Sequence, residues 1–271
     1  MSATATQLIV GFSLAALIGL AAWRVQALSA SGAWAAFITG GLLFGLGGFP
    51  WAALLLTFFI SSSALSRAFA RQKGLLSEKY AKGAQRDWGQ VLANGGLGAV
   101  LVIAQALLPG RGEVWLAFMG AMAAVNADTW ATELGVFSPT PPRLIANGRP
   151  VERGTSGGVS LIGYLAALAG ALLVGMVGAV FTPGLPLAGL LSGAAISGLL
   201  GSSFDSYLGA TIQAIYFCPN CQKETERHPL HTCGSKTTLG RGLRWLNNDW
   251  VNFACSLGGA LTMLTIGMLF F

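Results

Sequence analysis

The stretch NADTWATELG, residues 126–135, ends a long apolar run over residues 114–136 with acidic side chains. That run is long enough to cross a bilayer as a helix, so it places Asp128 and Glu133 at membrane depth, where carboxylates are rare and usually functional. A second stretch, VERGTSGGVS at residues 151–160, opens the next apolar run with a turn rich in glycine and hydroxyl groups. Backbone amides at such a turn bind anions. Together the two stretches suggest a phosphate site bridged by a metal ion.

The composition indicates a polytopic membrane protein. Of the 271 residues, 54% are hydrophobic and 10% are charged, whereas a soluble domain carries about 25% charged residues. We expect a single all-α domain over residues 1–271, with about eight transmembrane helices and a retained first span in place of a cleaved signal peptide. The apolar run at residues 187–217 is too long for a single crossing unless it tilts or breaks near residues 198–203. The expected spans are residues 6–22, 33–48, 51–65, 91–108, 114–136, 159–181, 187–217 and 250–271.

The distribution of basic residues predicts the topology. Fifteen of the sixteen Lys and Arg follow the first, third, fifth and seventh spans, and Arg111 is the exception. By the positive-inside rule, those four loops are cytoplasmic and both termini lie outside. The protein is therefore expected in the cell membrane, or an equivalent organelle membrane, with its polar motifs in cytoplasmic loops. The net charge of +6 reflects this topology, and no nucleic-acid-binding motif is present.

Three carboxylates are candidate Mg²⁺ ligands. On a straight helix Asp128 lies about 140° away from Glu133, so both reach one cavity only if the helix breaks, unless they serve separate functions. A salt bridge to a neighbouring helix is the structural alternative for either residue. Asp205 is a third candidate, because about fifteen apolar or small residues precede it. Hard oxygen ligands of this kind suit Mg²⁺ bound together with phosphate oxygens.

Further polar residues flank the spans. Arg86, Gln90 and Asn94 recur every four residues and form one helical stripe, which either joins helices through hydrogen bonds or faces a phosphate. The turn at residues 154–158 is either an ordinary helix cap or a phosphate cradle. Arg143, Arg149 and Arg153 flank that turn, and guanidinium groups bind phosphate in a bidentate manner. The last span begins with Asn248, Asp249 and Asn252, which are candidate ligand-binding residues. Asp249 is alternatively the cap of this helix.

The polar loop at residues 218–248 holds three of the four cysteines and both histidines. Its pattern, C-x-x-C followed by H-x-C, supplies Cys218, Cys221, His231 and Cys233. Four such ligands are sufficient for tetrahedral Zn²⁺, whose role would be structural because every coordination position is filled. The alternative is a reduced loop without metal.

Five motifs resemble, in matching order, one integral-membrane family. They are ADTWATELG, GTSGGVS, QVLANGG, FDSYLGATIQ and WLNNDWVN. The family includes the chloroplast phytyl-phosphate kinase of tocopherol synthesis and many uncharacterised bacterial and archaeal members. More distantly, the chain is similar to CTP-dependent phytol and dolichol kinases and to CDP-diacylglycerol synthases. The resemblance implies an Mg²⁺-dependent enzyme that transfers a phosphoryl group from a nucleoside triphosphate, with CTP as the expected donor, to a phytyl-, geranylgeranyl- or farnesyl-type monophosphate.

This hypothesis gives each candidate a role. Asp128, Glu133 and Asp205 hold Mg²⁺, and Arg153 acts with them at the reacting phosphates. An acceptor phosphate brings its own nucleophilic oxygen, so no general base is required. The alternatives are a secondary transporter or flippase of an anion, which intramembrane acids also suit, and a cytidylyltransferase of the CDP-lipid type. The candidate substrate-binding residues are Arg86, Asn94, Asn126, Thr129, Thr155, Ser156, Gly157, Gly158, Asn248, Asp249 and Asn252.

Overall fold

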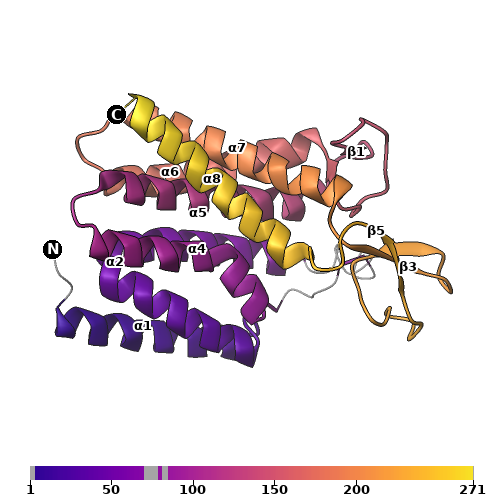
Figure 1. Ribbon diagram of the computed structural model, residues 1–271, viewed down its shortest axis with the longest axis horizontal. Coiled ribbons are helices and arrows are strands. Elements are labelled where there is room, and N and C mark those ends of the chain that lie inside the picture. The colour runs from indigo at the N-terminus through magenta and orange to yellow at the C-terminus, as the bar shows by residue number, and fades with distance from the viewer. Residues whose placement is uncertain (1–3, 70–78, 81–84, 271) are drawn as a thin grey trace.

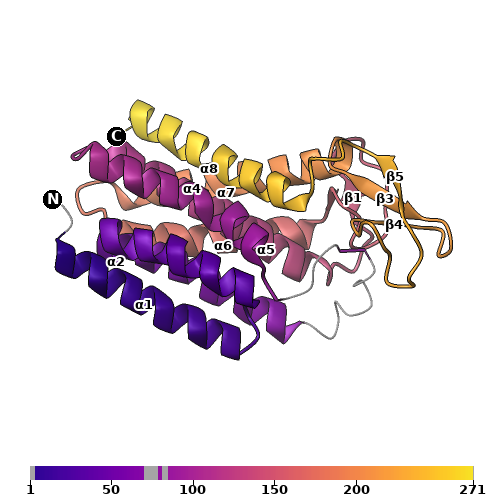
Figure 2. The same cartoon turned by 60° about the horizontal axis from the view of Figure 1, so that its bottom comes forward.

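A computed structural model of the protein describes residues 4–69, 79–80 and 85–270. Helices lie side by side along the long axis of the molecule, and a small sheet covers one end (Figures 1 and 2). Six of the helices in the described part, all except α5, are long and apolar enough to cross a membrane. The expected mostly helical fold is thus confirmed. The helices are α1 (Ala5–Arg24), α2 (Ala30–Ala68), α4 (Trp88–Leu107), α5 (Gly112–Gly135), α6 (Leu161–Val180), α7 (Leu187–Thr211) and α8 (Asn248–Phe270).

The outer surface of the bundle is apolar. Large side chains such as Trp34, Leu161 and Val180 are 70%, 75% and 73% exposed. Contiguous apolar surface of this kind is unfavourable in water and marks a site of membrane or protein contact. The bundle therefore presents to its surroundings the side chains that hydrocarbon accommodates.

Helix α2 consists of two helical segments joined at Gly48. This glycine has φ 71° and ψ −161°, outside the helical region, and Pro50 follows it. The amide of Ser29, just before α2, donates to the carbonyl of Arg86 over 2.9 Å, while the guanidinium of Arg86 donates to Ser63, near the other end, over 3.4 Å. Both ends of α2 thus meet the same residue, so the chain reverses direction at Gly48.

Helix α5 forms the centre of the bundle and packs against α2, α4, α6, α7 and α8. Every residue from Leu116 to Ala127 is buried. Small residues permit this packing, because a methyl group at Gly201 of α7 would collide with Ala124. Helix α5 is the least apolar of the long helices, and its neighbours separate it from the apolar surroundings of the bundle.

The prediction of an all-α fold is wrong in one respect, because the polar loops contain short strands. Strands β3 (Ile215–Cys218), β4 (Lys223–Thr225) and β5 (Thr238–Arg241) form an antiparallel sheet in the order β4-β3-β5. Tyr216 pairs with Thr225 across this sheet, and Phe217 pairs with Thr238. The strands β1 (Arg143–Leu144) and β2 (Gly158–Val159) form a second pair.

The expected span at residues 187–217 is also too long. Helix α7 runs unbroken to Thr211, and the last residues of the run, from Ile215 onward, belong to β3. The guanidinium of Arg241, in β5, donates to the carbonyl of Gly209 over 2.8 Å. This contact satisfies a carbonyl at the end of α7 and attaches the sheet to the bundle.

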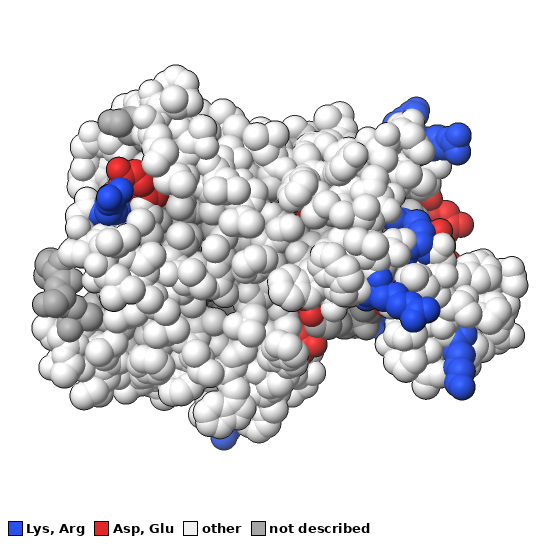
Figure 3. All heavy atoms as spheres, in the orientation of Figure 1, with Lys and Arg blue, Asp and Glu red and all other residues white. Residues whose placement is uncertain are grey.

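Charge is concentrated at one end of the molecule. On the face in Figure 3, most Lys and Arg lie at the end that carries the sheet, one small group of opposite charges lies at the other end, and the surface between them is almost entirely uncharged. Helix α1 begins and α8 ends at the opposite end (Figure 1). Arg71, Lys73 and Lys82, which contribute to the topology prediction, lie outside the described residues.

Candidate functional site

A cavity of about 440 Å³ lies at the end of the bundle next to the sheet. This volume falls within the range of small-molecule sites, roughly 300–1,000 Å³. Segments far apart in the sequence form its wall, from the end of α2 to the start of α8. Fourteen of the fifteen residues predicted to bind substrate, nucleotide or Mg²⁺ line it: Arg86, Asn94, Asp128, Thr129, Glu133, Arg153, Thr155, Ser156, Gly157, Gly158, Asp205, Asn248, Asp249 and Asn252.

The last two turns of α5 project into this cavity. Asp128 and Glu133 both line it although α5 is continuous from Gly112 to Gly135. The expectation that a helix break is needed to bring the two carboxylates together is therefore wrong. At about 100° per residue, Thr129 and Thr132 lie between the two carboxylates around the helix, and all four line the cavity, while Trp130 on the far side does not. The cavity therefore covers about half of the helix surface, which is wide enough to include both Asp128 and Glu133.

Two carboxylates meet between α5 and α7. The hydroxyl of Ser202 donates to Oδ1 of Asp128 over 3.2 Å. Asp205 follows Ser202 by one helical turn and lines the same cavity. Its Oδ2 atom is buried and has no hydrogen-bond partner among the described residues. A buried carboxylate oxygen without a partner is costly, so a bound cation or donor would stabilise it.

Glu133 is anchored on the opposite side of α5. Its side chain is buried, and its Oε1 accepts a hydrogen bond of 2.7 Å from the hydroxyl of Ser66, at the end of α2. Tyr80 lines the cavity nearby. Burial, together with the negative charges of Glu226 and Glu133, raises the pKa of this tyrosine, so it is protonated at neutral pH. Its hydroxyl is a potential donor to an anion.

The glycine-rich turn packs directly on the end of α7. Gly157 has φ +82°, and a methyl group there would come within 2.5 Å of Ala210. The hydroxyl of Ser156 donates to the side chain of Gln213 over 2.9 Å. The cap of α6 is Ser160, whose hydroxyl accepts from the amide of Gly163. The alternative that residues 154–158 merely cap the helix is therefore wrong, and the turn faces the cavity instead.

Two of the predicted arginines reach the cavity. Arg86 lies over the rings of Phe58 and Phe59, with 5.2 and 5.7 Å to their centroids. Burial lowers the pKa of Arg86 to about 10, so the guanidinium is still charged at neutral pH. Arg153 lines the cavity and donates to the carbonyl of Ser138 over 2.7 Å. The other arginines near the turn, Arg143 and Arg149, do not belong to the wall.

The start of α8 supplies amide and acid groups. Oδ1 of Asn247 accepts from the amides of Asp249 and Trp250 over 3.1 and 3.2 Å, so Asn247 is the helix cap. Asp249 is consequently not needed for that role and lines the cavity with Asn248 and Asn252.

Asn126 is the predicted binding residue that the cavity excludes. It is fully buried, and its Oδ1 accepts from the hydroxyls of Ser61 and Ser62 over 3.0 and 3.2 Å. Its Nδ2 donates to the carbonyl of Gly170 over 2.8 Å. The prediction for Asn126 is wrong because its amide joins α2, α5 and α6 and has no route to a ligand.

Sequence reasoning missed several wall residues. The most consequential are Glu226 and Arg227, which follow β4 and bring two further charges to the cavity. Gln213, which is almost fully buried, donates to Glu226 over 2.9 Å and also accepts from Ser156. No sequence signal distinguishes Glu226 from the other polar residues of its loop. The remaining missed members of the wall include Ser66, Tyr80, Tyr164, Ser203, Ser206 and Asn247.

The predicted zinc ligands form a separate cluster. The ligand atoms of Cys218, Cys221, His231 and Cys233 all lie within 4.8 Å of one another. They belong to the small sheet and its turns, and none of them is part of the cavity wall.

The helical bundle and its apolar surface define the class of protein: a polytopic integral membrane protein. The chain belongs to the family described as "Integral membrane protein DUF92", whose model matches residues 13–260. It is 35% identical to Protein PGR of Arabidopsis thaliana over 93% of each chain. It is 32% identical to an uncharacterized membrane protein of Methanocaldococcus jannaschii, over 78% of this chain and 85% of the relative. A Synechocystis membrane protein, also uncharacterized, is 30% identical over 62% and 68% of the two chains. No solved structure gives a significant match.

Proposed function

We propose that this protein is a membrane enzyme of the phytyl-phosphate kinase type. It transfers the terminal phosphoryl group of a nucleoside triphosphate, CTP in the first instance, to an isoprenyl monophosphate of phytyl, geranylgeranyl or farnesyl type. The product is the isoprenyl diphosphate. The cavity is large enough for a small ligand, and both its acids and its glycine-rich turn suit phosphate bound together with a cation.

A second pocket supports the proposal that the substrate has a hydrocarbon chain. A second, smaller pocket of about 70 Å³ lies between α1, α2 and α4, with apolar side chains such as Ile18 and Phe44 in its wall. Arg86, Gln90 and Asn94 line both this pocket and the polar cavity. A volume of about 70 Å³ has room for only a short part of a prenyl chain. An amphiphile with its phosphate head in the polar cavity would place the start of its chain in this pocket and the rest along the apolar surface of the bundle.

The charges of the cavity suit a cation–phosphate complex. Within the described residues the wall holds five carboxylates and three guanidinium groups: Asp128, Glu133, Asp205, Glu226 and Asp249, with Arg86, Arg153 and Arg227. Asp128, Glu133 and Asp205 are the residues that would hold one or two Mg²⁺ ions, with the two aspartates on one side of α5 and Glu133 on the other. Mg²⁺ neutralises phosphate charge when bound. Because the carboxylates outnumber the guanidinium groups, the cavity wall suits a divalent cation. The arginines are suited to bind the phosphate oxygens.

The reaction requires positioning more than covalent chemistry. An oxygen of the acceptor phosphate attacks the terminal phosphorus of the donor. The bond from that phosphorus to the bridging oxygen breaks, and the nucleoside diphosphate leaves with the electron pair. Arg86 and Arg153 neutralise the charge of the transferring group, and the turn over residues 154–158 holds phosphate through its amides and hydroxyls. The acceptor oxygen is already ionised, so the site needs no general base.

We further propose that the chain crosses the membrane eight times, with both termini outside. Helix α2 would supply two of these spans, because it reverses at Gly48, and the buried helix α5 would supply a central one. The cavity would then face the cytoplasm, where nucleotide and Mg²⁺ are available, since the basic loops lie at its end. The expected location is the cell membrane of a prokaryote or an equivalent organelle membrane.

The one-sided placement of the acids favours an enzyme over the transporter alternative. The candidate acids line a cavity at one end of the bundle. An alternating-access transporter also needs a polar route on the far side, whereas α5 is apolar from Val114 to Val125. A cytidylyltransferase would use the same acids, so an experiment must separate it from a kinase.

The identity of the released product makes that distinction. Purified protein in detergent or nanodiscs is incubated with CTP, Mg²⁺ and geranylgeranyl monophosphate, and the nucleotide products are separated. A kinase releases CDP in an amount equal to the diphosphate formed. Pyrophosphate together with a CDP-lipid would establish the cytidylyltransferase instead. If neither product depends on the lipid, the proposal of an enzyme is wrong.

A further inference from the structure

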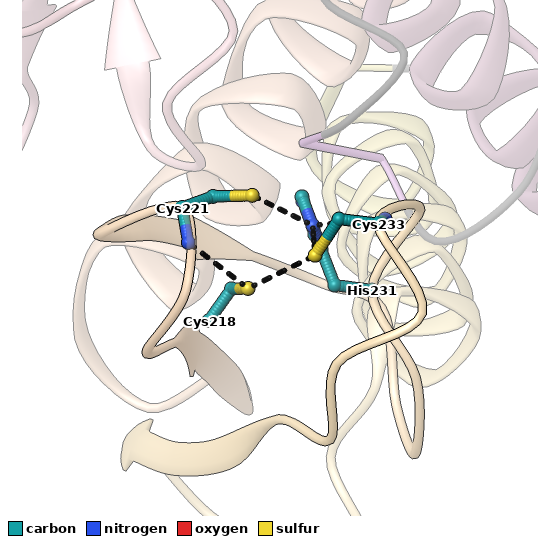
Figure 4. A group of neighbouring side chains, drawn as sticks. All are labelled: Cys218, Cys221, His231 and Cys233. Atoms are coloured by element: carbon teal, nitrogen blue, oxygen red, sulfur yellow. Dashed lines mark hydrogen bonds between the residues drawn. The ribbon is translucent and has the colours of Figure 1, made fainter.

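The cysteine-rich loop has the geometry of a metal site. Figure 4 shows the thiols of Cys218, Cys221 and Cys233 and the imidazole of His231 directed toward one centre. The sulfur atoms of Cys218 and Cys233 lie 3.6 Å apart. Nδ1 of His231 lies 3.5 Å from the sulfur of Cys221 and 3.2 Å from that of Cys233. All of these cysteines are free thiols.

These separations match the edges of a zinc tetrahedron. Zn–S bonds of about 2.3 Å and Zn–N bonds of about 2.05 Å at tetrahedral angles require ligand separations of about 3.8 Å between sulfurs and about 3.6 Å between sulfur and nitrogen. The three separations given above differ from these values by a few tenths of an ångström, and no two of the four ligand atoms lie more than 4.8 Å apart. The atoms therefore need to move by about 1 Å or less to enclose an ion. Three thiolates and one imidazole are a soft set that selects zinc over Mg²⁺ or Ca²⁺.

Backbone contacts support the ligands. The amide of Cys221 approaches the sulfur of Cys218 at 3.5 Å, an arrangement that stabilises a thiolate through a charge-assisted hydrogen bond. The amide of His231 donates to the carbonyl of Ser235 over 2.9 Å and holds the second turn closed. Each turn is therefore ordered by its own hydrogen bonds before any metal is considered.

The other histidine of the loop serves a different purpose. The ring of His228 stacks on Tyr216, with 4.3 Å between centroids and 12° between planes. Its Nδ1 lies 3.4 Å from the hydroxyl of Thr237. His228 is thus held within the sheet region, outside the cluster, and it provides an internal control.

We propose that Cys218, Cys221, His231 and Cys233 bind one structural zinc ion. Cys218 ends β3, Cys221 lies in the turn to β4, and the other two ligands follow β4. Zinc would therefore cross-link both ends of the segment 222–230. That segment carries Glu226 and Arg227 to the cavity wall, so the ion fixes the outer rim of the cavity. All four coordination positions are filled by the protein, which leaves no position for a substrate.

The metal content of the intact, purified protein tests this proposal. Protein prepared without added chelator, in detergent, is analysed for zinc by mass spectrometry, and we expect one zinc ion per chain. Co²⁺ exchanged into the site should give the visible absorption of tetrahedral thiolate coordination. Protein expressed with ample zinc that contains none, and that gives no such Co²⁺ spectrum, would overturn the proposal.

Two pairs of variants locate the ion. His231→Ala should lose most of the bound zinc, and His228→Ala should retain it. Cys221→Ser should lose it, and Cys255→Ser should retain it, because Cys255 is buried in α8 away from the cluster. Equal zinc content within either pair would contradict the assignment.

The structural role has its own readout. Removing zinc from the wild-type protein with a chelator should increase proteolytic cleavage within residues 219–230 at least several-fold, and adding zinc back should restore protection. Cleavage that is indifferent to zinc would show that the ion does not hold this segment. Because neither measurement uses catalysis, failure of the zinc proposal and failure of the proposed kinase activity remain distinguishable.

Discussion

The hydroxyl of Ser202 on α7 donates a hydrogen bond of 3.2 Å to Oδ1 of Asp128 on α5. This contact joins the two helices at the wall of the cavity. Asp205 lies one turn beyond Ser202, so both aspartates face one space. Two carboxylates in a shared site repel each other unless a cation or a proton intervenes. The proposed Mg²⁺ site follows from this arrangement.

Neutralising Asp128 should abolish turnover and leave the fold intact. Asp128→Asn retains an oxygen that can accept from Ser202, but the variant lacks the charge that would hold a divalent cation. Loss of several kcal/mol of transition-state stabilisation corresponds to a decrease in kcat of about 10²- to 10³-fold. Steady-state assays with purified protein measure this decrease, and size-exclusion chromatography verifies the fold.

Glu113→Gln is the matched control for Asp128→Asn. Glu113 occupies the first turn of the same helix, at the end remote from the cavity. The variant should retain kcat within about twofold. Equal losses in both variants would mean that any reduction in charge on α5 impairs the protein, and the assignment of Asp128 would fail.

Alanine at Gly157 should destabilise the protein much more than alanine at Gly148. Both glycines have positive φ, +82° and +72°, but a methyl group at Gly148 meets nothing within 4 Å, whereas one at Gly157 collides with Ala210. Gly148→Ala should cost about 1 kcal/mol from backbone strain alone. Gly157→Ala should cost roughly 1–3 kcal/mol more, because the turn must move away from α7. Thermal denaturation of the two variants measures the difference, and similar melting temperatures would disprove the close packing.

Filling the small apolar pocket should weaken the binding of prenyl substrates. Gly95 lines this pocket and Gly96 does not, although both lie on α4. Gly95→Leu should raise KM for geranylgeranyl monophosphate by about tenfold, the equivalent of roughly 1.4 kcal/mol of lost apolar contact. Gly96→Leu should leave this KM unchanged. An unaltered KM in Gly95→Leu would place the lipid chain elsewhere.

The two asparagines Asn126 and Asn252 should respond in opposite ways. Asn126→Ala leaves buried hydroxyl and carbonyl groups without their partner, so we expect a loss of about 1–3 kcal/mol of stability with an unchanged KM. Asn252→Ala should lower kcat/KM about tenfold, as expected for one lost hydrogen bond to a charged ligand, with little change in melting temperature. Melting temperature and steady-state kinetics are measured on each variant. The reverse pattern would contradict the structural role of Asn126 in joining α2, α5 and α6.

The sequence predicted the helices well because hydropathy is a strong local signal. The limits of α1, α4, α5, α6 and α8 differ from the expected spans by about one to three residues at each end. The turn at Gly48 lies at the boundary between the expected spans at residues 33–48 and 51–65. The sheet was missed because strands of two to four residues leave no detectable period. Because the aromatic and apolar residues of β3 continue the apolar run of α7, hydropathy predicts a seventh span that is too long.

The candidate site was predictable where residue chemistry alone is informative. Acids at membrane depth have few ordinary explanations, and a turn rich in glycine and hydroxyl groups suits an anion, so Asp128, Asp205 and the turn over residues 154–158 were identifiable as candidates. Helical angles misled for Asp128 and Glu133, because a helical wheel gives the angle between two side chains and not the width of the cavity that faces them. The same limitation applies to Asn126, which shares a face with Glu133 but lies deeper in the bundle. Glu226 could not be found, because its place depends on the fold of a polar loop.

Transfer of label from the terminal phosphate of CTP tests the central claim most directly. Purified wild-type protein and the Asp128→Asn variant are incubated with Mg²⁺, geranylgeranyl monophosphate and CTP labelled at its γ-phosphate, and the lipid fraction is counted. We predict label in geranylgeranyl diphosphate for the wild-type protein and a decrease of at least 10²-fold for the variant. Unlabelled lipid with the wild-type protein, or equal label with both, would contradict the account.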